Sequence, residues 1–175
     1  MLMIPPPFFR VYDLADLSDA GDEVVIAPDA EQRARLAQWA GVDAVDSFEA
    51  RVTLHRRSAS RFNYDAALSA DIVQSCVVSL QPVRSHLTLD VSRALHLSKF
   101  PASAKIAPHE LAPASDEGLE EIEDSHYDLA APLLEEFVLA IDPYPRAAGV
   151  VFEAPTDGDG TESPFAMLKG LQDRQ

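Results

Sequence analysis

The sequence contains a single cysteine, Cys76, among 175 residues. One thiol cannot form an intramolecular disulfide, and it excludes the zinc sites that use several cysteine ligands. No stretch reaches the ~20 consecutive apolar residues that a membrane-spanning helix requires. The opening residues carry a proline triplet, residues 5–7, and lack the apolar core of a secretory signal peptide. We therefore expect a cytoplasmic protein that does not associate with membranes.

Positive charge is also scarce, with 14 Lys and Arg against 29 Asp and Glu and a net charge of −15. Such a chain is repelled as a whole by a polyanion, because nucleic-acid binding draws much of its affinity from basic side chains. The charge is uneven, however. Residues 51–105 carry a net charge of +5, whereas residues 1–50 carry −7 and residues 106–175 carry −13. The middle of the chain is therefore basic between two acidic flanks.

Motifs for catalysis are missing from the sequence. The seven glycines form no phosphate-binding loop, and there is no nucleophile elbow or paired-histidine zinc motif. The five histidines show no metal-binding spacing on a predicted helix. Cys76 lies in an apolar segment with no adjacent group that would lower its pKa, so we expect a small buried side chain. We predict no enzymatic activity, no metal, no cofactor and no small-molecule substrate.

Two segments show strong helical patterns. Asp29 and Gln32 form a capping-box pattern before residues 30–40, and Gly41 is placed to end that helix. A second apolar helix is predicted over residues 129–141, with Asp128 as its N-cap. A short C-terminal helix is expected to start at Ser163-Pro164 after a flexible linker over residues 154–162.

Period-two alternation marks the strands. It predicts a hairpin from residues 48–55 and 61–68, a third strand over 71–78 and a fourth over 83–91. Shorter strands are expected at 8–14 and 24–26. We expect one α+β domain spanning residues 1–175, in which a curved antiparallel meander, with a barrel-like form as one option, is covered by helices. The acidic, proline-containing residues 101–126 are expected to form a mobile loop, with room for a short extended segment.

Arginines concentrate in the predicted hairpin region. Alternation places four of them on the outward face of the sheet, and a fifth, Arg56, is expected in the hairpin loop. The outward four are Arg51, Arg57, Arg61 and Arg84. A sheet face with several arginines is a candidate surface for nucleic acid or another partner, and all five arginines are candidate binding residues. The alternative is a solvated face, or one that pairs with the protein's own acidic loop, and the sequence leaves both open.

Three blocks of the sequence stand out when taken in order. They are the segment from Ala70 to Val83, the segment from Tyr127 to Arg146, and Ser163-Pro-Phe-Ala-Met-Leu-Lys169. Together they resemble the YceD family, a domain of unknown function in bacteria and plastids, and its alphaproteobacterial branch in particular. The resemblance implies a role in the accumulation, processing or stability of large-subunit (23S) ribosomal RNA, and no known catalysis. Many relatives carry a Cys-x-x-Cys pair in the first block. Here Ser79 replaces the second cysteine, so we predict no zinc site.

The leading expectation is thus a ribosome-biogenesis factor that binds pre-ribosomal RNA or an assembling ribosomal protein of the large subunit. In one version the arginine-bearing face binds RNA. In the other the acidic regions bind a basic ribosomal protein. The alternative is an acidic adaptor or chaperone for a basic partner unrelated to RNA. An enzyme with an unrecognised site would instead require a deep pocket lined by ionisable groups of perturbed pKa.

Overall fold

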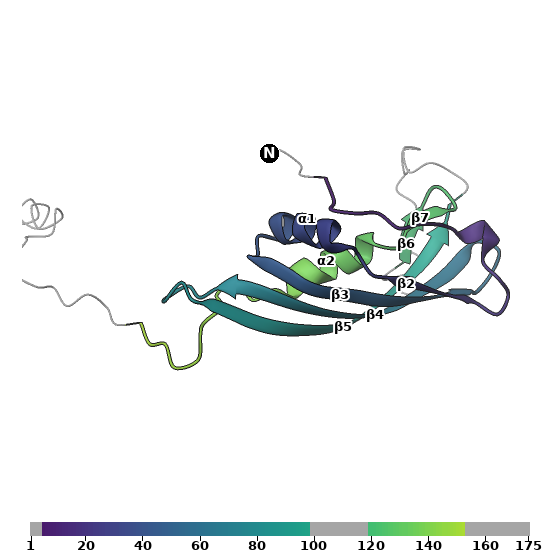
Figure 1. The fold of residues 1–175 in the computed structure, drawn as a ribbon. Helices are drawn as coiled ribbons and strands as arrows, with labels where there is room; N and C mark the ends of the chain where they lie inside the picture. Colours follow the sequence, from purple (N-terminus) through teal and green to yellow (C-terminus); the bar gives the residue numbers. More distant parts are fainter. Residues whose placement is uncertain (1–4, 99–118, 153–175) are drawn as a thin grey trace, which may run out of the picture.

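Three long strands form the centre of a five-stranded sheet in the computed structural model, which describes residues 5–98 and 119–152 (Figure 1). β3 (Ala44–Arg56), β4 (Arg61–Ser75) and β5 (Pro82–Leu97) run antiparallel to one another in chain order. The short strand β2 (Asp22–Ile26) pairs antiparallel with β3 at one edge. β6 (Leu119–Ile122) pairs with β5 at the other edge, in parallel orientation.

Both described helices lie on the same face of this sheet (Figure 1). α1 covers Ala30–Ala40, with the bounds that the sequence predicts. The Asp29 side chain accepts a hydrogen bond from the Gln32 amide, the Gln32 side chain accepts one from the Asp29 amide, and Gly41 ends the helix at a φ of 72°. Local capping chemistry therefore fixes α1 independently of its packing.

The second helix, α2, covers Ala131–Ala140 and is shorter than the predicted 129–141. Asp128 is not its N-cap. That carboxylate instead accepts hydrogen bonds from the backbone amides of Arg10 and Ala130, at 2.7 and 3.1 Å, which ties the approach to the helix onto the N-terminal segment. The helix begins after this junction, and Pro132 lies in its first turn, where a missing N–H is tolerated.

The core lies between the helices and the inner face of the sheet. Even-numbered residues from Phe48 to Leu54 of β3 and from Phe62 to Ile72 of β4 alternate into it and are fully or nearly fully buried, as period two requires. Phe48 makes edge-on ring contacts with Phe8 and with Phe137 of α2, at centroid distances of 5.8 and 5.5 Å. The buried Tyr64 hydroxyl donates to the Leu129 carbonyl at 2.9 Å. These contacts fix α2 over the centre of the sheet.

A separate two-stranded sheet closes one end of the core. β1 (Val11–Asp13) pairs antiparallel with β7 (His126–Asp128), and Asp13 lies opposite His126 in the register. A short 3-10 turn, Leu14–Asp16, follows β1 and buries Leu14. The sequence predicts a strand over 8–14, but its first part packs as an irregular segment.

The structure confirms the α+β class and the helical cover but corrects further details of the prediction. The sheet is mixed, since β6 is parallel, and it is not closed into a barrel. Residues 71–75 continue β4, so the predicted separate strand over 71–78 is wrong. Residues 119–122 and 126 belong to β6 and β7, so this part of the predicted 101–126 loop is sheet. Residues 101–118 of that loop, the 154–162 linker and the C-terminal helix lie outside the described residues. Among the residues described, no helix has the length and apolarity to cross a membrane.

Candidate functional site

The outer face of the sheet, opposite the helices, presents the odd-numbered residues of β3 and β4 and the even-numbered residues of β5 from 84 to 92. Most of these side chains are polar and exposed, as predicted for the wet face. The register sets them in rows across the strands, and one such row is Arg51, Ala67 and Asp90. This surface contains the predicted arginine face, so its charge decides what it can bind.

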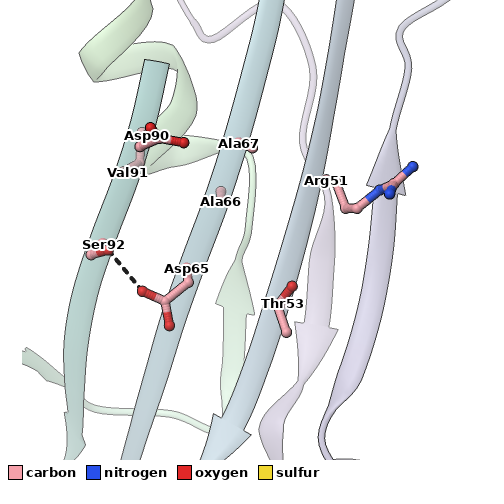
Figure 2. A pocket seen from close by; sticks show the side chains of 8 residues that line it. All are labelled: Arg51, Thr53, Asp65, Ala66, Ala67, Asp90, Val91 and Ser92. Atoms are coloured by element: carbon pink, nitrogen blue, oxygen red, sulfur yellow. Dashed lines mark hydrogen bonds between the residues drawn. The ribbon is translucent and has the colours of Figure 1, made fainter. Parts of the chain in front are cut away.

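A shallow hollow of about 280 Å³ lies at the centre of this face (Figure 2). The small side chain of Ala67 leaves space between its taller cross-strand neighbours. Figure 2 shows the Arg51 side chain directed away from Ala67, and Ser92 donating to Asp65 at 2.7 Å. The lining residues are Arg51, Thr53, Asp65, Ala66, Ala67, Asp90, Val91 and Ser92. The hollow thus combines one guanidinium with two carboxylates.

Two of the predicted arginines are held by carboxylates of the same face. Arg51 of β3 lies 3.5 Å from the carboxylate of Glu23 on β2. Arg84 of β5 forms an ion pair with Asp46, at the irregular start of β3. Each guanidinium therefore has its charge balanced within the protein. A phosphate would have to compete with a carboxylate that is already in place.

The arginines are also far apart along the sheet. Arg61 begins β4, Arg51 pairs with Ala67, and Arg84 pairs with Val73. At roughly 3.3 Å per residue, these positions are separated by about 20 Å each along β4. The predicted residues share a face in part but do not form one basic patch.

Arg56 is not in the hairpin loop, where the sequence predicts it. It is the last residue of β3, and its Nη2 donates to the carbonyls of Leu14 and Leu17 at 2.9 and 3.1 Å. Its guanidinium also lies over the Phe62 ring, 5.3 Å from the centroid. Arg56 therefore anchors the N-terminal turn onto the sheet. Its parity with Leu54, a core residue, was the available indication, because period two places both on the inner face.

Arg57 and Arg61 flank the β3–β4 connection. Arg57 is in the loop rather than in a strand, and its backbone amide donates to the Arg61 carbonyl at 2.8 Å. Both side chains are exposed. Two arginines at a hairpin end are a smaller cationic feature than the predicted face of four arginines with Arg56 in the adjoining loop.

Carboxylates outnumber guanidinium groups on this face. Glu49, Asp65 and Asp90 are exposed at outward positions of β3, β4 and β5. Asp71 accepts a hydrogen bond from Ser47 at 2.6 Å and contacts His86 at 2.7 Å, and these bonds lower its pKa. With Glu23 and Asp46, acidic side chains outnumber the arginines on the described outer face. The same alternation that places Arg51 and Arg84 outward also places Glu49, Asp65 and Asp90 outward, so the acidic share of this face was present in the sequence pattern.

Cys76 follows β4 and is fully buried, as expected. Its environment was not expected. The sulfur accepts hydrogen bonds from the backbone amides of Ser79 and Ala147, at 3.4 and 3.3 Å. The Ser79 side chain and these amides lower the pKa of the thiol to about 6, because they stabilise the thiolate. The expectation that nothing adjacent lowers this pKa is therefore wrong. Ala147 belongs to the segment after α2, so its contact with Cys76 cannot be inferred from the residues next to Cys76 in the sequence.

Comparison with known proteins identifies no relative. No protein-family model matches the chain, and no curated protein and no solved structure shows significant similarity to it.

Proposed function

We propose that this chain is a non-catalytic, cytoplasmic factor in the biogenesis of the large ribosomal subunit that binds a basic ribosomal protein. Through that protein it would influence the synthesis, processing or stability of 23S ribosomal RNA. The ribosomal part of the proposal rests on the resemblance of the three sequence blocks to the YceD family. The lone cysteine, which forms no intramolecular disulfide, agrees with a reducing compartment.

The binding mode rests on one observation: carboxylates form ion pairs with arginines of the outer face. Arg51 and Arg84 are neutralised by Glu23 and Asp46. Glu49 and Asp90 remain exposed and acidic. A face of this kind repels phosphates and attracts Lys and Arg side chains, and the net charge of −15 adds long-range attraction for a cationic protein. Of the two versions considered above, the geometry favours a protein partner over direct RNA contact.

Affinity purification of the tagged chain from a bacterial lysate, with and without ribonuclease, tests this proposal. We expect a basic protein of the large subunit to be recovered in both samples and identified by mass spectrometry. Loss of every ribosomal component on ribonuclease treatment would contradict the protein-binding mode, because it would mean that RNA bridges the complex. Recovery of no ribosomal component in either sample would contradict the proposal as a whole.

A further inference from the structure

The outer edge of β5 is open along most of its length. β5 runs from Pro82 to Leu97, but β6 pairs only with residues 94–97. No described strand pairs with the outer edge of residues 82–93. In Figure 1 β5 borders the sheet, and the two helices lie over its face rather than beside this edge. The backbone groups that point away from β4 therefore form a row of donors and acceptors without a strand partner among residues 5–98 and 119–152.

This edge also lacks the features that normally prevent strand addition. Such features include bulges, internal prolines, lysines and short length. The pairing of β5 with β4 runs from Pro82 to His96 without a register shift, and Pro82 is the terminal residue of the strand. β5 contains no lysine. An inward-facing charge appears only at the far end, where Arg93 forms an ion pair with Glu136 of α2 at 2.6 Å. The stretch from Val83 to Ser92 is thus regular and accessible.

The side chains along the edge define what could bind there. On the inner face, Val83, Leu87 and Leu89 are only half buried, although the leucines pack against the core. An added strand with apolar residues at alternate positions would cover them. On the outer face, Asp90 is exposed, and Arg84 is already held by Asp46. The positions between the apolar ones would therefore favour cationic side chains.

We propose that the open edge of β5 binds an extended basic segment of a partner protein as an additional strand, with apolar side chains inward and Lys or Arg outward. This inference rests on the proposed function, since it assumes a cationic protein partner, and it specifies where and how that partner binds. Backbone hydrogen bonds supply affinity in this mode, and the alternating side chains supply selectivity. A second copy of the chain is a poorer occupant, because two molecules with a net charge of −15 repel each other.

Amide hydrogen exchange of the full chain, measured by NMR, tests the inference directly. The probe is a ten-residue peptide of alternating Lys and Val, compared with a Glu–Val peptide of the same length and with deca-lysine. We expect the Lys–Val peptide to slow exchange severalfold at every second amide between Val83 and Ser92, with β3 unchanged. The Glu–Val peptide should not bind. Deca-lysine should bind more weakly and without the alternating pattern.

Two adjacent lysine substitutions provide a matched pair. Leu87→Lys places a charge on the inner face of the edge, and Thr88→Lys places the same charge on the outer face. We expect Leu87→Lys to weaken Lys–Val binding by more than about tenfold, or about 1.4 kcal/mol, and Thr88→Lys to weaken it less. Should Leu87→Lys fail to fold, the exchange pattern of the unsubstituted chain still decides.

Several results would overturn the inference. Binding of the Lys–Val peptide without slower exchange at the β5 amides that point away from β4 would do so, while leaving the proposed function intact. In the free chain, only the alternate amides that bond to β4 should be protected. Slow exchange of the remaining amides without peptide would show that the chain itself or a second copy covers the edge. Failure of any basic peptide to bind, together with loss of all ribosomal proteins after ribonuclease, would contradict the proposed function as well.

Discussion

Arg84 of β5 and Asp46 of β3 form an ion pair across the outer face of the sheet, although β4 lies between their strands. The pair is possible because the register of β3 shifts between Val45 and Ser47, where Asp46 lies. Both side chains remain largely exposed, at 77% and 46%. The pair therefore affects the charge of the face more than the stability of the fold.

The stability effect of this pair is predicted to be small. Exposed ion pairs contribute about 0–1 kcal/mol, because water screens them and two long side chains must be ordered. Arg84→Gln and Asp46→Asn should each lower the free energy of unfolding by less than about 1 kcal/mol in urea titrations. A coupling energy in the double variant well above this value would show that the pair is structural rather than a feature of surface charge.

Arg56 should behave in the opposite way. Its guanidinium donates to backbone carbonyls of the N-terminal turn and covers Phe62. Charge-assisted hydrogen bonds of this kind contribute about 1.5–3 kcal/mol, so Arg56→Ala should lower the free energy of unfolding by about 2 kcal/mol. The exposed neighbour provides the control, since Arg57→Ala should change stability by less than about 0.5 kcal/mol. Equal effects of the two substitutions would refute the anchoring role.

The Cys76 thiol is expected to titrate at about pH 6, below the ordinary value of 9.0. Absorbance at 240 nm reports the thiolate directly, and the chain has no other cysteine to obscure it. The same titration in urea should shift toward the ordinary value. Because the pKa is lowered by folding, the unfolded chain binds more protons between these limits, and stability should rise as pH increases from about 6 to 9. Cys76→Ala should remove that rise, and a native midpoint near 9 would contradict the prediction.

His126 links the two strands of the small sheet electrostatically. Its Nδ1 lies 2.9 Å from Asp124 and its Nε2 lies 3.8 Å from Asp13, and these carboxylates raise its pKa above 6.5. The protonated imidazole is therefore favoured in the folded state. The resulting contribution to folding stability is complete below pH 6.5. It is lost as pH rises through the higher pKa that His126 has in the folded state. An NMR titration should place the His126 midpoint above 6.5, and Asp124→Asn should move it down. A midpoint at or below 6.5 would argue against the contacts.

Local sequence chemistry predicted some elements closely. α1 carries its own start and stop in Asp29, Gln32 and Gly41, so its limits follow without knowledge of packing. The break predicted near Ser69 is absent because Ala70 pairs with Phe48 and fills the core, which keeps β4 continuous. Ala70, a small residue between the polar Ser69 and Asp71, is compatible with a turn, but here it is a buried residue within β4.

Long-range contacts explain the remaining differences. The parallel pairing of residues 119–122 with the end of β5 is not announced by a periodic pattern in the sequence. For the candidate site, alternation correctly placed Arg51 and Arg84 outward. It could not show that Glu23 and Asp46 would neutralise them, since these acids come from other parts of the chain. Likewise, the amide of Ala147 reaches Cys76 across 71 positions.

The central claim is that acidic side chains attract a basic ribosomal protein. It is tested most directly with two charge-reversed variants, by measuring whether each still recovers a basic large-subunit protein after ribonuclease treatment. One variant is Glu49→Arg with Asp90→Arg, and its counterpart is Arg57→Glu with Arg84→Glu, all at exposed positions. If the acidic character of the outer face and of the β5 edge attracts the partner, the first variant loses the protein and the second retains it. Retention by the first variant and loss by the second would contradict the account, because it would mean that the arginines make the contact.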